Sequence, residues 1–352
     1  MSLEKRINAF VGLGKFLSQF STDSITKKDK ILYNDLFFDV FKTQVKRAKE
    51  YNGWFNDENI LFSLNNWSKS LTKTNLLTWT ANYSLAETPH KTIAIIMAGN
   101  IPLVGFHDFL TVLITGNKAL VKLSSNDKQF LPLIAKYLEY IEPSFKGTIT
   151  FTEKKLTNFD AVIATGSNNT ARYFDYYFGK YPSIIRKSRN SVAVLTGDES
   201  NEELAGLGED IFRYFGLGCR SVSKLFVPEN YDFDKFFKAI FNYGDIINYA
   251  KYLNNYDYNK AVYLMSLFKL QENGFLMLKE DVSYSSPIAT LFYEKYESKE
   301  KLIQKLEEDT DKIQCVIGNV AVTNQVDFGK SQTPMLWDYA DGVDTILFLS
   351  AL

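Results

Sequence analysis

The sequence has few of the residues that build disulfide frameworks and metal sites. Its 352 residues include two cysteines and two histidines, and no Cys/His pattern has the spacing of metal ligands. No apolar run approaches the length of a bilayer span, and Lys15 interrupts the apolar residues near the start, which argues against a signal peptide. We therefore predict a cytoplasmic protein with no metal site and no membrane span.

The chain also lacks an excess of charge of one sign. Its 40 basic and 41 acidic residues are interspersed and give a formal net charge of −1. This balance provides no electrostatic footprint for nucleic acid or an anionic membrane surface, so small molecules are the expected partners. The 28 Phe and 21 Tyr residues have two interpretations, the lining of an apolar acyl pocket or ordinary core packing.

Apolar periodicity predicts an α/β protein of about two domains. Helical spacing dominates the first 90 residues. From residue 91 onward, apolar runs at 92–97 and 119–123 flank a helical pattern that starts at Phe106, which makes one parallel βαβ unit. No Gly-x-Gly-x-x-Gly follows the first strand, so the standard dinucleotide-binding fingerprint is missing.

The rest of the chain continues this alternation. Further strands are expected at 148–151, 160–164, 191–196, 224–227, 275–278, 288–292 and 315–317. Further helices are expected at 130–141, 171–178, 204–215, 232–266 and 299–309. Asn126 or Asp127 is placed to cap the first of these helices, and Ser200–Glu203 has the pattern of a capping box. The tail ends in a strand-like run at 345–349.

One cysteine stands where a helix is expected to stop. Cys219 follows Gly216 and Gly218 and precedes a strand. A nucleophilic thiol must be ionised and needs donors for the oxyanion of a tetrahedral intermediate. Arg220 is next in the chain and could lower the pKa of Cys219, although adjacent side chains of a strand point to opposite faces. A buried structural cysteine is the alternative interpretation.

Two expected loops at the carboxyl ends of strands carry polar groups. Asn100 follows the first strand, where α/β proteins place functional groups, and its alternative role is to form the turn before Ile101-Pro102. The turn at 165–170 exposes backbone N–H groups at a helix start. This turn suits a phosphate, but helix capping favours the same residue types.

Five segments occur in the order and approximate spacing of the aldehyde dehydrogenase superfamily. They are Gly99-Asn100-Ile101-Pro102-Leu103, Thr115–Ser124, Ala164–Ser167, Arg189–Val194 and Gly216–Arg220. Within that superfamily the chain is most similar to the acyl-CoA reductase branch typified by the fatty-acid reductase of bacterial bioluminescence. The resemblance is clearest over about residues 90–228 and implies an aldehyde-dehydrogenase-like α/β fold, with a Rossmann-like cofactor lobe and a catalytic lobe.

The resemblance also implies domains. Residues 1–90 would be an N-terminal helical region of the cofactor lobe, and 91–196 the nicotinamide-cofactor-binding α/β domain. Residues 197–325 would be the catalytic α/β domain that carries Cys219. The C-terminal segment, 326–352, is expected to pack back on the body or on a partner subunit, because the superfamily usually forms homo-oligomers.

The resemblance assigns roles to particular residues. Cys219 matches the nucleophile of the family and Asn100 the side-chain amide of its oxyanion hole. Two residues match the strand-end pair that contacts the adenosine ribose or its phosphate, and three match the turn beside the phosphates and nicotinamide. These implied cofactor-binding residues are Lys122 and Ser124, then Thr165, Gly166 and Ser167.

Two departures from the family pattern matter for the reaction. Hydrolytic aldehyde dehydrogenases carry a glutamate general base just before the segment that resembles 189–194, but residues 185–188 contain no carboxylate. Its absence suits an acyl-enzyme that exchanges with a thiol or accepts hydride. Ser283 stands where a glutamate that holds the nicotinamide ribose is expected, and Glu280 or Asp281 is a possible substitute.

These points predict an enzyme that reduces an acyl-CoA, with a fatty or aryl acyl group, to the aldehyde. NADPH or NADH would supply the hydride, and CoA would be part of the substrate. The proton donor is unassigned; His107 is a candidate, although a packed histidine is the more ordinary role. The alternatives are an acyl-phosphate reductase of the glutamyl-phosphate type, a catalytically degenerate scaffold, and a protein that passes acyl groups between Cys219 and a protein partner or acyl-protein substrate.

Overall fold

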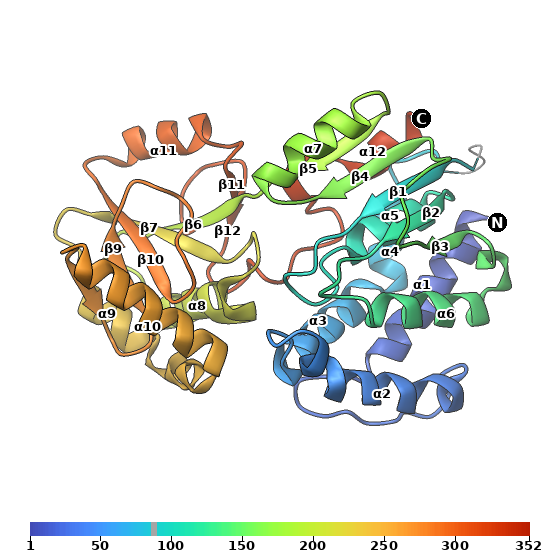
Figure 1. Cartoon of the computed structure of the whole chain (residues 1–352), viewed down its shortest axis with the longest axis horizontal. Helices are drawn as coiled ribbons and strands as arrows, with labels where there is room; N and C mark the ends of the chain where they lie inside the picture. The colour runs from blue at the N-terminus through green and yellow to red at the C-terminus, as the bar shows by residue number, and fades with distance from the viewer. Residues whose placement is uncertain (86–89) are drawn as a thin grey trace. The chain divides into compact units, whose positions relative to one another are not determined.

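The computed structural model describes residues 1–85 and 90–352, and these form two compact units (Figure 1). Unit 1 contains Met1–Lys187 and Met335–Leu352, and unit 2 contains Ser188–Pro334. The chain thus leaves unit 1 after Lys187 and returns to it at Met335. The last part of the expected N-terminal helical region, residues 86–89, lies outside the described residues.

Unit 1 begins with four helices, which confirms the helical pattern of the first 90 residues. They are α1 (Leu3–Leu17), α2 (Asn34–Tyr51), α3 (Asp57–Ser70) and α4 (Lys73–Thr80). Side chains of Ser2, Asn56 and Thr72 cap α1, α3 and α4 by accepting a backbone N–H of the first turn. The helices bury aromatic rings such as Phe10 and Phe16 in the core of unit 1.

A five-stranded parallel sheet forms the centre of unit 1, with the order β3-β2-β1-β4-β5 in the described residues. Its strands are β1 (Thr92–Ile96), β2 (Lys118–Lys122), β3 (Ile149–Phe151), β4 (Ala161–Thr165) and β5 (Ser183–Arg186). The connecting helices are α5 (Phe106–Ile114), α6 (Phe130–Ile141), the short 3₁₀ helix η1 (Pro143–Phe145) and α7 (Asn168–Phe178). The strand order reverses between β1 and β4, and open α/β sheets bind ligands at the carboxyl ends of strands beside such a reversal.

The start of α6 differs from the expectation. Its N-cap is Gln129, which makes no side-chain capping bond, and neither Asn126 nor Asp127 caps it. The carboxylate of Asp127 instead accepts a hydrogen bond from the backbone N–H of Leu103, at 2.9 Å. A contact across the fold therefore takes the side chain that local sequence assigns to the helix.

The C-terminal segment also differs, because 345–349 forms a helix and not a strand. After the 3₁₀ turn η4 (Ala340–Gly342), helix α12 (Thr345–Ser350) starts at the N-cap Asp344, whose side chain accepts from the Leu347 N–H. Ile346 and Leu349, three residues apart, are buried, while Leu347 between them is 61% exposed. That is helical spacing, which a run of five apolar residues cannot distinguish from a buried strand.

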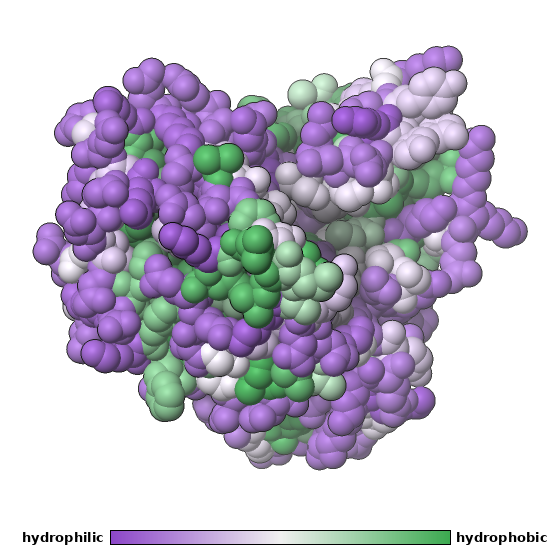
Figure 2. Space-filling model, turned by 60° about the vertical axis from the view of Figure 1, so that its left-hand side comes forward, coloured by the Kyte–Doolittle hydropathy of each residue, from purple (hydrophilic) through white to green (hydrophobic). Residues whose placement is uncertain are grey.

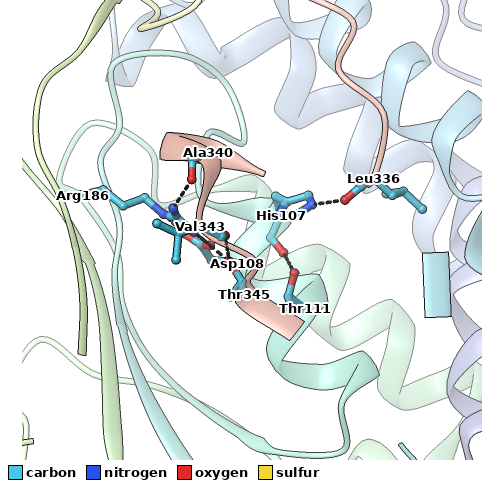
Figure 3. Close-up of polar contacts among 8 residues, drawn as sticks. All are labelled: His107, Asp108, Thr111, Arg186, Leu336, Ala340, Val343 and Thr345. Atoms are coloured by element: carbon cyan, nitrogen blue, oxygen red, sulfur yellow. Dashed lines mark hydrogen bonds and ion pairs between the residues drawn. The ribbon is translucent and has the colours of Figure 1, made fainter. Parts of the chain in front are cut away.

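Polar contacts hold the C-terminal segment within unit 1 (Figure 3). Arg186, the last residue of β5, forms a buried ion pair with Asp108 of α5, with Nη2 and Oδ1 2.8 Å apart. The same guanidinium donates to the Ala340 carbonyl (2.7 Å) and to Thr345 Oγ1 (3.0 Å). Neither β5 nor this network is predicted from the sequence.

Unit 2 has a seven-stranded sheet in the described residues, with the order β12-β11-β6-β7-β10-β9-β8. Its strands are β6 (Asn190–Val194), β7 (Val222–Pro228), β8 (Leu270–Glu272), β9 (Met277–Glu280), β10 (Thr290–Tyr296), β11 (Ile313–Ile317) and β12 (Gln325–Val326). All neighbours pair in parallel except β8 and β9, which are antiparallel. The fold is therefore mixed α/β, as expected.

Helices cover the sheet of unit 2 on both faces. They are α8 (Asn201–Phe212), η2 (Arg213–Gly216), α9 (Phe233–Ala239), η3 (Phe241–Asn248), α10 (Ala250–Met265) and α11 (Lys299–Glu308). Leu204 and Leu207 of α8 pack in one apolar cluster, and Leu302 and Leu306 of α11 in another. The capping box of Ser200 and Glu203 is present at the start of α8, as predicted.

The division between the units does not fall where we placed the domain boundaries. We expected the strand near 191–196 to end the cofactor domain, but β6 pairs with β7 and β11 in the sheet of unit 2, so the division lies after Lys187. Of the segment 326–352, residues up to Pro334 belong to unit 2 and the rest to unit 1. Strand pairing, which the sequence does not reveal, accounts for both differences.

The face that Figure 2 shows is mostly hydrophilic, with several hydrophobic patches. In unit 2, the end of α10 and the segment before β8 expose Met265 (85%) and Leu267 (90%). None of the helices in the described part of the chain has the length and apolar character that crossing a membrane requires.

Candidate active site

The approach to Cys219 in unit 2 is a strained stretch of backbone. Helix α8 ends at Phe212, three residues earlier than the apolar pattern predicts, and Tyr214 (φ 56°) and Phe215 (φ 58°) adopt left-handed conformations. Such a conformation costs about 1 kcal/mol for a residue with a side chain. Both side chains are buried, and the Phe215 ring stacks on Tyr249 with centroids 4.5 Å apart. Packing therefore holds the chain in the turn that leads to Cys219.

Cys219 lies at the second position of a turn, and its side chain is exposed. The turn closes with the Ser221 N–H donating to the Gly218 carbonyl at 3.0 Å. Ser191 Oγ, on β6, donates to the Cys219 carbonyl at 2.9 Å, and the Gly218 N–H donates to Ser221 Oγ at 3.3 Å. Hydrogen bonds thus fix the backbone around Cys219, while the residue itself is exposed.

A second layer of buried polar groups supports this turn. Gln332 Nε2 donates to Ser221 Oγ at 3.4 Å. The segment before Gln332 is held by Asp210 of α8, whose carboxylate accepts the Gly329 N–H (2.6 Å), the Ser331 N–H (2.9 Å) and Ser331 Oγ (2.7 Å). Burial raises the pKa of Asp210 to about 6, against the lowering effect of these hydrogen bonds.

The Arg220 guanidinium reaches the second cysteine of the chain. Its Nη1 donates to Sγ of Cys315, on β11, at 3.3 Å. Cys315 is buried. We expected Arg220 to lower the pKa of Cys219. In the structure, its guanidinium directs at least part of its charge toward Cys315.

Asn100 lies in unit 1, in the loop that follows β1, and is exposed. Three side chains from other segments hold this loop. Asp127 accepts from the Leu103 N–H, Ser63 Oγ donates to the Pro102 carbonyl at 3.1 Å, and Asn52 Nδ2 donates to the Gly99 carbonyl at 3.4 Å. Leu103 has a left-handed backbone with φ 58° and is buried.

The predicted cofactor-binding residues lie at the same edge of the unit 1 sheet as the Asn100 loop. Lys122 ends β2, and its Nζ donates to the Lys154 carbonyl at 3.5 Å. Ser124 follows in the next turn. Thr165 ends β4, the Gly166 N–H donates to the Arg186 carbonyl at 3.2 Å, and Ser167 caps α7 by accepting from the Thr170 N–H. Asn100 and the five predicted cofactor-binding residues therefore all lie at the carboxyl ends of β1, β2 and β4.

This donor set has the chemistry that a nicotinamide dinucleotide needs. It combines the ammonium of Lys122, the hydroxyls of Ser124 and Thr165, and the start of α7 at Ser167. These groups lie at the carboxyl edge of the sheet, where the strand order reverses between β1 and β4. In the described residues, no group of three or more His, Cys, Asp and Glu side chains is placed to hold a metal ion.

His107, a candidate proton donor, and Ser283 and Asp281, which stand near the expected ribose contact, make other contacts in the structure. His107 Nε2 lies 2.8 Å from the Leu336 carbonyl, which fits a role in holding the C-terminal segment (Figure 3). The Ser283 N–H donates to Asp281 Oδ1 at 2.9 Å. Burial raises the pKa of Asp281, but the hydrogen bonds from Lys279 and Ser283 outweigh it and hold that pKa at about 2. Asp281 is therefore an anion next to Ser283.

A small cavity of about 80 Å³ in unit 2 lies away from Cys219. Thr196, Glu199 and Asn319 line it beyond the carboxyl ends of β6 and β11, whereas Cys219 precedes the amino end of β7. Glu199 accepts from the Thr196 and Gly197 N–H groups, so its carboxylate shapes the turn after β6.

Sequence reasoning missed the residues that hold the two loops. Ser191 lies in the Arg189–Val194 segment, which gave it no role, and Asp210 and Asp127 lie in none of the five segments. Asp127 was noticed only because it stands between a strand and the helix at 130–141, and we interpreted it as a cap of that helix.

The chain shares its fold with solved aldehyde dehydrogenases. The chain is similar to aldehyde dehydrogenase 21 from Physcomitrella patens in complex with the product succinate, at 10% identity and a TM-score of 0.69, over 100% of this chain and 84% of that one. It is also similar to the NAD⁺ complex of an aldehyde dehydrogenase from Bacillus cereus, at 13% identity and a TM-score of 0.60, over 92% and 73% of the chains. An oxidoreductase from Marinobacter aquaeolei matches at 12% identity and a TM-score of 0.66, over 95% and 79%.

The family model described as acyl-CoA reductase (LuxC) matches residues 42–242, more than half of the chain. The protein therefore belongs to this family, as the sequence motifs indicated, and it has the fold of the aldehyde dehydrogenases. It is an oxidoreductase that acts on acyl or aldehyde groups. No curated protein sequence matches the chain.

Proposed function

We propose that the protein reduces an acyl-CoA with a fatty or aryl acyl group to the aldehyde through an acyl-enzyme on Cys219. Membership of the acyl-CoA reductase family supports the substrate class. The observation that carries the proposal is the exposed Cys219 in a turn whose backbone is fixed by Ser191 and Ser221. An exposed thiol on a rigid turn suits nucleophilic attack better than core packing.

In the proposed mechanism, the Cys219 thiolate attacks the thioester carbonyl and forms a tetrahedral intermediate. The Cys219 backbone N–H and the Asn100 amide donate to the oxyanion, a role that rests on the family resemblance of the 99–103 loop. The bond to the CoA sulfur then breaks, and CoA leaves as the thiolate, which takes a proton from solvent. When bound, the nicotinamide supplies the hydride that reduces the Cys219 thioester. Cys219 finally leaves as thiolate and releases the aldehyde.

The residues at 185–188 support reduction over hydrolysis. Arg186 stands in the neighbourhood where hydrolytic relatives carry a glutamate, and its guanidinium is buried in the ion pair with Asp108. An arginine stays protonated and cannot serve as a general base. Without a base for water, the acyl-enzyme persists long enough to accept hydride.

For the cofactor, we propose NADPH or NADH held at the carboxyl edge of the unit 1 sheet. Lys122 and Ser124 would contact the adenosine ribose or its phosphate, and Thr165, Gly166 and Ser167 the phosphates and nicotinamide. The NAD⁺ complex of the Bacillus cereus aldehyde dehydrogenase, which shares the fold, supports a nicotinamide cofactor.

We further propose that the enzyme works in the cytoplasm as a homo-oligomer, without nucleic-acid partners. The exposed Met265 and Leu267 of unit 2 support an association with another protein surface, either a second copy or an acyl-transferring partner. An acyl-phosphate reductase of the glutamyl-phosphate type remains the second candidate, because it shares the cysteine and also lacks the glutamate.

The test is a panel of acyl-CoAs of increasing chain length, and an acyl phosphate, each with NADPH and with NADH. Loss of cofactor absorbance is followed for the wild type and for Cys219→Ala, with Cys315→Ala as the matched cysteine control. We expect turnover with an acyl-CoA that Cys219→Ala abolishes and Cys315→Ala retains. Turnover with the acyl phosphate alone would transfer the assignment to the second candidate, and unchanged turnover in Cys219→Ala would refute the mechanism.

A further inference from the structure

Two loops at the carboxyl edge of the unit 1 sheet are tied to each other. One is the loop 99–103 after β1, and the other is the turn 124–127 after β2. The first carries Asn100, and the second begins with Ser124. Because β1 and β2 are neighbours in the sheet, the loops that follow them leave it side by side (Figure 1).

The first tie is the carboxylate of Asp127. Its Oδ2 accepts the Leu103 N–H at 2.9 Å, three residues after Asn100. The left-handed backbone of Leu103 is unfavourable for a residue with a β-carbon, so it needs contacts that compensate for its cost. The Asp127 bond is such a contact, made at the strained residue itself.

The second and third ties join the other ends of the loops. Gly99 packs so closely on the turn that a β-carbon there would lie 2.6 Å from Ser124 Oγ and 3.2 Å from the Asp127 backbone nitrogen. Asn52, at the end of α2, donates from Nδ2 to both the Gly99 carbonyl (3.4 Å) and the Asn126 carbonyl (3.3 Å). Its Oδ1 accepts from the Trp54 N–H, which fixes the amide that bridges the loops.

We propose that Asp127 is a positioning residue that makes the Asn100 loop and the Lys122–Ser124 segment move as one body. Cofactor that binds to Lys122 and Ser124 then also orders the loop that presents Asn100. This inference rests on the proposed function, because the roles of Asn100, Lys122 and Ser124 come from it. It adds a residue that no motif of the chain singles out.

The chemistry of the tie specifies which substitutions preserve it. The Leu103 N–H needs an acceptor oxygen, and both a carboxylate and a neutral carboxyl group offer one. Burial raises the pKa of Asp127 to about 6, so the neutral form is accessible near that pH. Asparagine keeps an acceptor oxygen at nearly the same place, whereas alanine removes it.

The first experiment is hydrogen exchange of the full-length protein, read by mass spectrometry on the peptide that contains Leu103. Loss of the one hydrogen bond should speed exchange of the Leu103 amide by about tenfold in Asp127→Ala. Asp127→Asn should restore wild-type exchange. Lys128→Ala is the matched control, since its ammonium pairs with Glu153 at the surface. Equal exchange in wild type and Asp127→Ala would overturn the proposal.

The second experiment adds NADPH to the same variants, without substrate. In the wild type and in Asp127→Asn, NADPH should slow exchange in the 99–103 loop. In Asp127→Ala that protection should be lost, and by reciprocity the Kd for NADPH should rise by up to about tenfold. The KM for NADPH should rise with it, with a smaller change in kcat. A structural role alone would lower the melting temperature and leave the protection by NADPH intact, which would refute the coupling.

The failures of the two proposals can be told apart. If NADPH gives neither a thermal shift nor protection anywhere in the wild type, the proposed cofactor site and the coupling both fall. If the wild type binds NADPH and reduces acyl-CoA but Asp127→Ala responds as the wild type does, the coupling alone falls. Should Asp127→Ala not fold, Asn52→Ala removes the bridging donor of the third tie, and unchanged NADPH protection in that variant would count against one moving body.

Discussion

The Asn100 loop (99–103) and the Cys219 turn (218–221) carry the two proposed catalytic groups, and they are built in different ways. The Asn100 loop follows β1 at the carboxyl edge of its sheet, where side chains from α2, α3 and the turn after β2 hold its backbone. The Cys219 turn precedes β7 at the amino edge of its sheet. It is reached through a run of left-handed residues and held by hydroxyls.

The difference shows two routes to a fixed functional group. A loop at the carboxyl edge occupies the position where α/β sheets place ligand-binding groups, so the strand order itself brings Asn100 to a binding position. The amino edge has no such advantage. There the chain must be turned sharply out of α8, and buried Tyr214 and Phe215 hold the strained backbone that turns it.

The largest expected effect is the loss of kcat when Cys219 or Asn100 is replaced, and its size should differ between the two because their proposed chemical roles differ. Cys219→Ser should lower kcat by about 10⁴-fold or more, because the weaker nucleophile cannot form the acyl-enzyme efficiently. Asn100→Ala should lower kcat by about 10²- to 10³-fold, as expected for one oxyanion donor. Steady-state kinetics with acyl-CoA and NADPH measure both. Equal losses in the two variants would contradict the division of roles.

The next effect concerns the half-buried carboxylate of Asp127, which accepts a hydrogen bond from the Asn100 loop. The pKa of Asp127 is raised by burial from 3.8 to about 6, so the wild type loses stability as pH rises through that range, by about 3 kcal/mol in all. Asp127→Asn has no such titration. Relative to the wild type it should gain stability between pH 4 and pH 7. Urea unfolding at both pH values measures the difference, and a difference that does not change with pH would refute the explanation.

Two glycines test how each loop is built. A β-carbon at Gly99 would lie 2.7 Å from the Ser124 Cβ, so Gly99→Ala should cost about 1–3 kcal/mol by overpacking. Gly216 has φ 75° and a β-carbon there would come no nearer than 3.4 Å to the Ile211 carbonyl, so Gly216→Ala should cost about 1 kcal/mol through the backbone alone. Thermal unfolding checks both, and a larger cost for Gly216→Ala would reverse the comparison.

The smallest effect comes from two matched hydroxyls. Ser191 donates to the Cys219 carbonyl and Ser63 to the Pro102 carbonyl, and both serines are buried. Each alanine variant should lose about 1 kcal/mol of stability. Ser191→Ala alone should change the rate at which iodoacetamide alkylates Cys219. The same change of rate in Ser63→Ala would show that alkylation does not report on the Cys219 turn.

Much of the fold could be predicted because strong periodicity marks it. The βαβ unit of β1, α5 and β2 has apolar runs of strand length around a helical pattern, and the structure has it with parallel pairing. Strand β5 could not be found, because its four residues contain two adjacent isoleucines and little else of a strand. Helix α12 was mistaken for a strand because five apolar residues fit either period.

For the candidate site, local sequence predicted positions better than contacts. The motifs pointed to loops at the carboxyl ends of β1, β2 and β4, and the structure has loops there. The residues that hold these loops in place are distant from them in the sequence. Asp210 holds a segment about 120 residues later, at Gly329 and Ser331, and such pairings leave no periodic signal. The left-handed Tyr214 and Phe215 were also unforeseen, since their residue types do not favour that conformation.

The most direct test of the central claim is to capture the acyl group on the enzyme. The protein is incubated with a turned-over acyl-CoA in the absence of nicotinamide, quenched in acid, and analysed by intact-mass and peptide mass spectrometry beside Cys219→Ala. We predict a mass increase equal to one acyl group, located on the peptide that contains Cys219 and absent from the variant. An acyl group located on Cys315, or no adduct on a preparation that reduces the same acyl-CoA, would contradict the account.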